Sequence, residues 1–248
     1  MKISWRLIGL GAVGYLIFLV STLPADAVLP RLQTRGVLAS GVSGSIWNGK
    51  VAALQIGGFS FGAVDWDVSV WHFFTGQLSV ELHAKRDDGS LQATLAKGFG
   101  KRLIVRRLQG VQPMTALGSL GLPGGWDGSI QLNLSEVYLE NNWPVHIRGT
   151  ADAKNLSGPA NQPMQIGSFR VAFSGDKEQD GLKGSLTSAG DGPFDVTGSL
   201  RLLPNRNYVI DGKVIAHPGT PKPIMDALQY LGPPDAQGAH PLSMSGRL

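Results

Sequence analysis

The chain has 248 residues, of which 42% are hydrophobic and 16% charged, and its net charge at pH 7 is +4. This balance argues against a disordered chain, because it provides enough apolar side chains to build a core. The sequence contains no cysteine, which excludes disulfides and thiolate metal ligands. Its 34 glycines follow no period of three, which excludes collagen, and their spacing between short apolar runs is typical of turns and bulges in a β-rich chain.

The first predicted element is a hydrophobic run over residues 7–25 that carries no charged side chain. As an α-helix these residues would span about 28 Å, close to the hydrocarbon thickness of a bilayer. Lys2 and Arg6 precede the run and Asp26 follows it. The positive-inside tendency therefore predicts a short cytoplasmic tail at residues 1–6, a transmembrane anchor, and a remainder on the far side of the membrane.

A cleaved signal peptide is the alternative interpretation of this run. The triplet Ala25-Asp26-Ala27 has the small residues of a cleavage site. The run is longer than a typical signal core of about 7–15 residues, and Trp5 and Tyr15 suit the interfaces of a retained anchor. We therefore expect the anchor to be retained, and both interpretations export the rest of the chain.

Residues 26–36 are predicted to form a juxtamembrane linker in which Pro30 prevents continuation of the helix. Residues 37–248 are predicted to form one β-domain. Its first unit is a hairpin with strands at 37–48 and 51–62 and a turn near Asn48-Gly49.

Alternation of apolar and polar residues predicts most of the later strands. In the strand at 64–71, Trp66 and Val68 would face inward while Asp65 and Asp67 face outward. Further strands are expected at 77–84, 91–95, 103–108, 129–135, 137–139, 145–148, 168–173, 194–202, 208–210 and 242–246, with an irregularity at Arg106-Arg107 and a turn at Asn141-Asn142.

Two short helices are predicted after the anchor, at residues 112–120 and 222–231. In the second, Ile224, Leu228 and Leu231 form an apolar stripe. The glycine- and proline-rich residues 121–125 are expected to divide two halves of one sheet system. The predicted fold is therefore mainly β, with an antiparallel curved sheet or a sandwich; without a second sheet, part of the apolar face would stay open as a groove.

The sequence contains no motif typical of catalysis or metal binding. Its five histidines are dispersed and form no HExxH spacing. Paired carboxylates such as Asp65 and Asp67 can act in acid–base chemistry or bind calcium, but on an exposed strand face they mainly give solubility. We therefore expect no enzymatic activity, no cofactor and no metal.

The basic cluster of Lys101, Arg102, Arg106 and Arg107 is expected to be the solvated face of a strand. Beyond a membrane no nucleic acid is available, so we exclude it as a partner despite the basic pI. The aromatic residues Trp47, Trp66, Trp71, Phe73, Phe74, Trp126 and Trp143 are expected in the core, or on an apolar face that receives a partner strand or an acyl chain.

Two stretches resemble the protein N family of the type II (general) secretion system. The family pattern is G-x-x-G-[ST]-[IL]-W-x-G followed by a strand with G-x-x-x-W-x-[ILV]. The residues that match are Gly41, Gly44, Ser45, Ile46, Trp47 and Gly49 in the first part and Gly62, Trp66 and Val68 in the second. Residues 124–144 and 242–248 are also similar to the family. These motifs are structural, and the family has no catalytic residues to transfer.

The resemblance implies a single-pass inner-membrane protein with a cytoplasmic N-terminus and a periplasmic β-domain. It would be an accessory part of the machine that exports folded proteins across the outer membrane. Its partners would be the lipid bilayer and other secretion subunits, in the inner-membrane platform or the secretin. The alternatives are an anchored lipid-binding or lipid-transfer protein with an apolar β-groove, and a periplasmic hydrolase or glycan binder that uses the tryptophans.

Overall fold

The computed structural model describes residues 9, 11, 14–15, 18–28, 36–69, 78–97, 102–116, 125–158, 164–178 and 181–247. Residues 18–21 are helical, and the short helix α2 (Ala25–Val28) follows them. No helix within these ranges is long and apolar enough to cross a bilayer. Several residues of the predicted anchor at 7–25, the tail at 1–6 and residues 29–35 of the predicted linker lie outside the described ranges.

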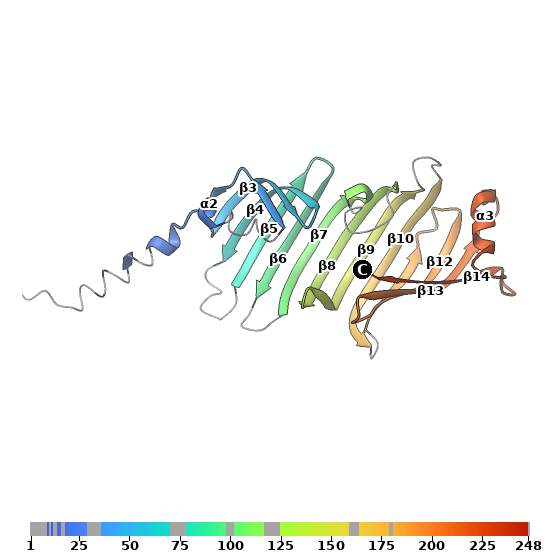
Figure 1. Ribbon diagram of the computed structural model, residues 1–248. Coiled ribbons are helices and arrows are strands. Elements are labelled where there is room, and N and C mark those ends of the chain that lie inside the picture. The colour runs from blue at the N-terminus through green and yellow to red at the C-terminus, as the bar shows by residue number, and fades with distance from the viewer. Residues whose placement is uncertain are drawn as a thin grey trace, which may run out of the picture.

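The described part of the chain forms one long antiparallel sheet, as Figure 1 shows. Its strands follow the chain order, except that β1 and β2 both pair with β3, β1 with residues 53–56 and β2 with residues 49–50. Their bounds are β1 (Val37–Ser40), β2 (Ser43–Gly44), β3 (Asn48–Ile56), β4 (Phe59–Ser69), β5 (Leu78–Arg86), β6 (Gly89–Lys97), β7 (Arg102–Pro113), β8 (Asp127–Glu140), β9 (Trp143–Ser157), β10 (Gln165–Glu178), β11 (Gly181–Ser188), β12 (Phe194–Leu202), β13 (Asn207–Ala216) and β14 (Ala239–Arg247). The mainly β prediction is confirmed in the form of a single open sheet rather than a sandwich.

The first hairpin forms, but its turn was predicted at the wrong residues. Asn48 and Gly49 belong to β3 and pair with β4, and the chain reverses at residues 45–47. A second turn at Gly57-Gly58, with φ angles of 59° and 88°, divides the predicted strand at 51–62. A two-residue hairpin turn needs positive φ at both residues, so that its twist matches the twist of the flanking strands. Glycine adopts positive φ without steric cost.

The helix predicted at 112–120 is not found in the described part of that segment. Gln112 and Pro113 extend β7, where they pair with Ile130 and Ser129 of β8. Only residues 114–116 form a 3₁₀ turn, and residues 117–124 lie outside the described ranges. Pairing along a neighbouring strand overrides the weak helical spacing of this short segment.

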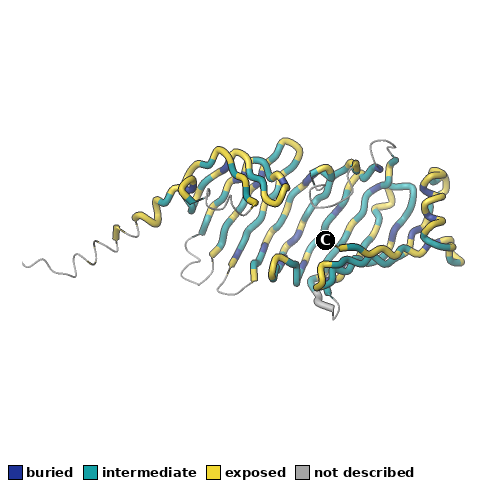
Figure 2. Tube along the Cα trace, viewed as in Figure 1, coloured by how far each residue is buried: buried dark blue, intermediate teal, exposed yellow. Residues whose placement is uncertain are grey.

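Core residues gather on one face of the sheet, from its first strand to its last. Residues paired directly across neighbouring strands point to the same face. Pairs on this face include Ala39–Leu54, Val51–Val64, Trp66–Leu82, Leu95–Val105, Val105–Val137, Val137–Ile147, Val171–Leu186, Val196–Val214 and Ile210–Met244. Buried positions accordingly recur on strands along the whole sheet (Figure 2).

The opposite face is polar and carries ion pairs between strands. Arg201 pairs with Asp211 at 2.7 Å, and Arg107 pairs with Glu81 at 2.9 Å. The irregularity predicted at Arg106-Arg107 is confirmed, because Arg107 has a φ of 51° and the register of β6 and β7 shifts there. The sheet is therefore amphipathic, with one polar and one apolar surface.

The second predicted helix is confirmed as α3 (Lys222–Gln229), which stands at the C-terminal end of the sheet (Figure 1). Pro221 precedes its first turn, where a missing backbone N–H costs nothing. Its buried residues Ile224 and Leu228 pack against Val196 of β12 and Val214 of β13. In the described residues, α2 and α3 thus lie at opposite ends of the same long sheet.

Candidate functional site

The residues of the first family pattern fold into a tight turn between β2 and β3. The Ser45 hydroxyl accepts hydrogen bonds from the backbone N–H groups of Trp47, at 3.2 Å, and Asn48, at 3.1 Å. The Ser45 N–H donates to the Asn48 carbonyl at 2.8 Å, which closes the turn. Ser45 therefore satisfies, within four residues, backbone groups that the turn would otherwise leave unpaired.

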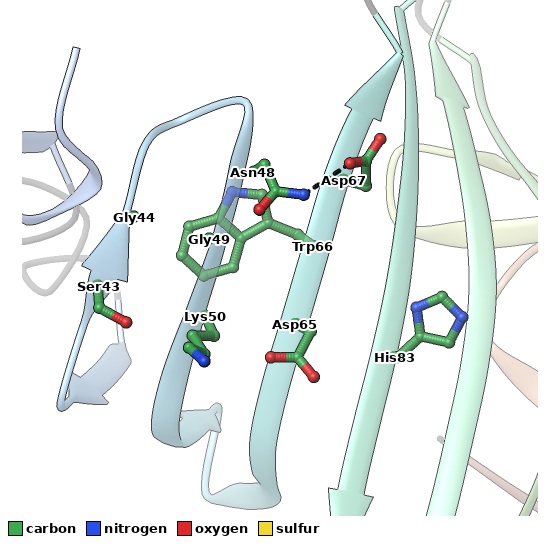
Figure 3. A pocket seen from close by; sticks show the side chains of 9 residues that line it. All are labelled: Ser43, Gly44, Asn48, Gly49, Lys50, Asp65, Trp66, Asp67 and His83. Atoms are coloured by element: carbon green, nitrogen blue, oxygen red, sulfur yellow. Dashed lines mark hydrogen bonds between the residues drawn. The ribbon is translucent and has the colours of Figure 1, made fainter. Parts of the chain in front are cut away.

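The glycines of this pattern stand where a side chain has no room. Gly44 has a φ of +90°, and a Cβ there would lie 2.6 Å from the Asn48 carbonyl oxygen. A Cβ at Gly49 would collide with the indole ring of Trp66, which lies over Gly49 in Figure 3. A Cβ at Gly41 would lie 2.7 Å from the Cβ of Ala52. The close packing of turn and strands requires glycine at each position.

The second family pattern joins this turn to β4. The Trp66 indole N–H donates to the Ile46 carbonyl at 3.2 Å, and the Val68 N–H donates to the Trp47 carbonyl at 2.6 Å. Gly62 has a φ of +74° and lets β4 approach β5, since a Cβ there would lie 2.6 Å from the Lys85 carbonyl oxygen. The two patterns, separated in sequence, thus form one hydrogen-bonded unit.

The same turn holds the chain that leaves the N-terminal helical residues. The Trp47 indole N–H donates to the Val20 carbonyl at 2.8 Å, and the Ile46 N–H donates to the Leu23 carbonyl at 3.0 Å. Pro24 and Ser45 form a β-bridge. We call residues 45–47 the docking turn, because each of them contacts this N-terminal segment.

The residue that follows the bridge is buried beneath the docking turn. Ala25, the first residue of α2, is 1% exposed. It borders an apolar cavity of about 250 Å³ together with Val28, Ile46, Val51 and other residues of the apolar sheet face. The N-terminal segment is thus fixed to the sheet by backbone hydrogen bonds and by packing.

A polar hollow of about 340 Å³ lies beside the docking turn, and Figure 3 shows the side chains that line it. The Asn48 side-chain amide donates to the Asp67 carboxylate at 2.7 Å. Asp65 stands opposite Lys50 on one side and His83 on the other in the strand register. Within the described residues, no group of three His, Asp or Glu side chains is placed to hold a metal ion.

Among the histidines in the described ranges, His217 makes two polar contacts through its ring nitrogens. His217 has its Nε2 2.8 Å from the Asp195 carboxylate and its Nδ1 3.0 Å from the Gly192 carbonyl oxygen. The hydrogen bond to Asp195 raises the pKa of His217 and lowers that of Asp195. The two contacts of His217 join β12, through Asp195, and the β11–β12 loop, through Gly192, to the segment before α3. His72 lies outside the described residues, as do Trp71, Phe73 and Phe74.

The motif residues were predicted as one group, but their contacts with the N-terminal segment were not predicted. The apolar N-terminal run gave no signal for a hydrogen bond to Trp47, because the acceptor is a backbone carbonyl that every residue possesses. The usable signal was that the last carbonyl groups of any helix lack donors within the helix, and that the later turn contains a tryptophan, whose indole N–H is a donor.

The comparisons with known proteins agree with the motifs. A family model described as type II secretion system (T2SS), protein N, matches residues 35–243. The chain is 27% identical to type II secretion system protein N of Aeromonas hydrophila, over 100% of both chains. It is 24% identical to type II secretion system protein N of Vibrio cholerae serotype O1, over 98% of this chain and 99% of that protein. No solved structure matches the chain.

Proposed function

The chain belongs to the type II secretion system protein N family, and from this membership we propose that it is a non-enzymatic, inner-membrane-anchored accessory subunit of that system. Residues 7–25 would span the inner membrane from a cytoplasmic N-terminus, and the sheet would lie in the periplasm. It would support the export of folded proteins by contacting other secretion subunits.

The observation that carries this proposal is the attachment of residues 20–25 to the docking turn. The hydrogen bonds from Trp47 to Val20 and from Ile46 to Leu23 would fix the sheet directly at the end of the membrane helix. Such an attachment gives the sheet a defined position at the membrane rather than a flexible tether. Tryptophan also suits a position at the membrane–water interface, since its ring is apolar and its N–H is polar.

The burial of Ala25 favours a retained anchor over a cleaved signal peptide. Ala25-Asp26-Ala27, the possible cleavage triplet, lies within α2, and Ala25 is 1% exposed. Cleavage there would remove residues 20–24, which provide the acceptors for the docking turn. In this proposal Gly41, Gly44, Ser45, Ile46, Trp47, Gly49, Gly62, Trp66 and Val68 act as structural residues that build and hold this attachment.

The partner contact is proposed at the free edge of β14. In the described residues β14 pairs only with β13, so its other edge presents unpaired backbone groups. Edge strands of this kind bind an added strand from a partner. A short extended segment of another secretion subunit would fit this edge, whereas β1 at the opposite end offers only four residues.

The proposal is tested by complementing a strain that lacks the gene. The full chain and a version with residues 1–17 replaced by a cleavable signal peptide are compared for the amount of secreted enzyme in the medium. We expect the full chain alone to restore secretion, at equal protein levels. Secretion that is normal in the gene deletion, with altered outer-membrane permeability instead, would contradict a secretion role.

A second candidate function, lipid binding, has one observation in its favour. Within the described residues no second sheet covers the apolar face, and the helices α2 and α3 lie only at its ends. Exposed apolar surface of this extent marks a binding surface in most proteins.

A further inference from the structure

The apolar face deepens into a cavity at its C-terminal end, beside α3. The cavity has a volume of about 820 Å³, within the range of pockets for small molecules. Its floor includes Phe169, Leu186, Val196 and Val214 from the sheet, and its wall includes Ile224 and Leu228 from α3. We infer that this cavity binds an acyl chain of a membrane phospholipid, a conclusion that rests on the proposed membrane anchoring.

The chemistry of the lining favours a hydrocarbon chain over a peptide. No charged side chain lines the cavity, and the indole N–H of Trp126 is the single polar side-chain group among its lining residues. The backbone groups of β10 to β13 are paired with neighbouring strands on both edges, and the free edge of β14 lies at the side of the sheet rather than over the cavity floor. An extended peptide would therefore bury N–H and C=O groups without partners, at a cost of several kcal/mol, whereas an acyl chain has none to satisfy.

A partner helix satisfies its own backbone, but the place that a helix would take beside the floor is already filled. One amphipathic helix, α3, already forms the wall. Three methionines, Met114, Met164 and Met244, also line the cavity. Their flexible side chains adapt to apolar ligands of varied shape. The acyl chains of a bilayer are ligands of this kind.

The continuity of the apolar face indicates the bilayer as the source of the lipid. From the cavity the face continues through β9, β8 and β7 to β3, where the second apolar cavity borders Ala25 and Val28. At about 4.8 Å per strand, the thirteen strands from β1 to β14 span roughly 58 Å. One end of this apolar surface therefore lies at the proposed membrane anchor and the other end holds the larger cavity.

Photo-crosslinking in cells grown with radioactive phosphate tests this inference. The photoreactive amino acid benzoylphenylalanine replaces Leu186, which lines the cavity, or Thr187, its exposed neighbour on the opposite face of β11. Phe18 in the proposed anchor serves as the control position for contact with the bilayer. We expect a labelled phospholipid adduct at positions 18 and 186 and none at position 187.

Two variants of α3 then test whether the adduct depends on the cavity itself. Ala227→Trp places a large ring in the cavity, whereas Asp226→Trp places the same ring on the neighbouring exposed position that does not line it. Displacing about two methylene groups of the ligand corresponds to a loss of roughly tenfold in affinity. We expect Ala227→Trp to reduce the amount of adduct at position 186 roughly tenfold and Asp226→Trp to leave it unchanged.

Three outcomes would overturn the inference, and a fourth would separate it from the proposed function. Equal adducts at positions 186 and 187 would show unspecific contact, and a protein adduct alone at 186 would show that the cavity receives a polypeptide. An adduct at 18 without one at 186 would leave the anchor intact and refute the acyl site. An adduct at 186 without one at 18 would support the acyl site and contradict the anchoring on which the proposed function depends.

Discussion

The Trp47 indole N–H and the Val20 carbonyl oxygen, 27 positions apart in the sequence, are joined by a hydrogen bond of 2.8 Å. Val20 lies near the end of the N-terminal helical residues, and its carbonyl oxygen also accepts a longer hydrogen bond of 3.4 Å from the Leu23 N–H. The tryptophan of the docking turn therefore adds the shorter hydrogen bond at the end of that helix, from outside it. A side chain in the sheet domain thus fixes the direction in which the chain enters the sheet.

Replacing Trp47 tests this attachment. Trp47→Phe keeps the ring but loses the donor, so we expect a loss of about 1 kcal/mol in the free energy of unfolding. Trp47→Ala also removes packing, and because the side chain is only half-buried we expect about 2 kcal/mol, less than at a fully buried site. Thermal unfolding of the full chain measures both. Hydrogen exchange in residues 44–50 should also accelerate; unchanged exchange there in both variants would show that the attachment does not depend on Trp47.

The lack of space at Gly44 predicts a position-specific cost. Gly44 and Gly190 have similar φ angles, +90° and +78°, but a Cβ at Gly190 has no neighbour within 4 Å. Asparagine tolerates this backbone region, so the same substitution isolates the steric effect. We expect Gly44→Asn to destabilise the protein by about 1–3 kcal/mol more than Gly190→Asn, as read from denaturant unfolding. Equal costs at the two positions would mean that the turn adjusts to a side chain.

Most of the sheet was predictable because its strands are exposed on one face and buried on the other. The alternation around Trp66 and Val68 is a direct consequence of that one-sided burial, so the strand follows from the sequence. β11 was missed because Gly184 interrupts its pattern. A Cβ at Gly184 would lie 2.8 Å from the ring of Phe173, so the neighbouring side chain fills the place that an apolar residue would have marked.

The site was predictable only as a set of residues. The family pattern grouped Ser45, Ile46 and Trp47, but their contacts are with backbone carbonyls of the N-terminal segment. Side-chain chemistry in a sequence carries no signal for such acceptors. The cavity beside α3 was equally hidden, because its lining comes from segments between Met114 and Met244 that only the register of the sheet brings together.

The carboxylates Asp65 and Asp67 are expected to be dispensable for secretion. Asp67 accepts a hydrogen bond from Asn48 at 2.7 Å, and both side chains lie on exposed positions of β4. The double variant Asp65→Asn, Asp67→Asn should restore secretion in the deletion strain and change the free energy of unfolding by less than about 1 kcal/mol. Calcium should not shift the melting temperature of either protein. Lost secretion at normal stability would identify the pair as functional.

The free edge of β14 allows a separate test of partner binding. Pro241 has no N–H, so its nitrogen faces the free edge, and by alternation that of Ser245 does as well. Ser245→Pro should therefore keep the pairing with β13 but remove a donor from the edge. We expect an unchanged melting temperature and reduced co-purification of other secretion subunits, whereas Ser245→Ala should retain them. Full co-purification with Ser245→Pro would place the partner contact elsewhere.

The contact between His217 and Asp195 predicts a dependence of stability on pH. The pKa of His217 is raised above its ordinary value of 6.5, mainly by the hydrogen bond to Asp195. A raised pKa contributes stability that is complete below the unfolded value and is lost as pH rises through the folded value. The pKa of Asp195 is lowered from 3.8, mainly by the bond to His217, so its contribution is lost only as pH falls through that lower value. The pair therefore stabilises the segment before α3 from mildly acidic pH up to the raised pKa of the imidazole.

Asp195→Asn should accordingly lower the melting temperature of the full chain more near about pH 5.5 than near about pH 8.5, because a smaller fraction of His217 is charged at the higher pH. Asp211→Asn is the matched control. Asp211 pairs with Arg201 at 2.7 Å on the same sheet, and a guanidinium stays charged across this range, so its penalty should not change with pH. Equal penalties for Asp195→Asn at both pH values would show that His217 does not titrate against Asp195 in the folded protein, and that its hydrogen bond to Gly192 alone positions the ring.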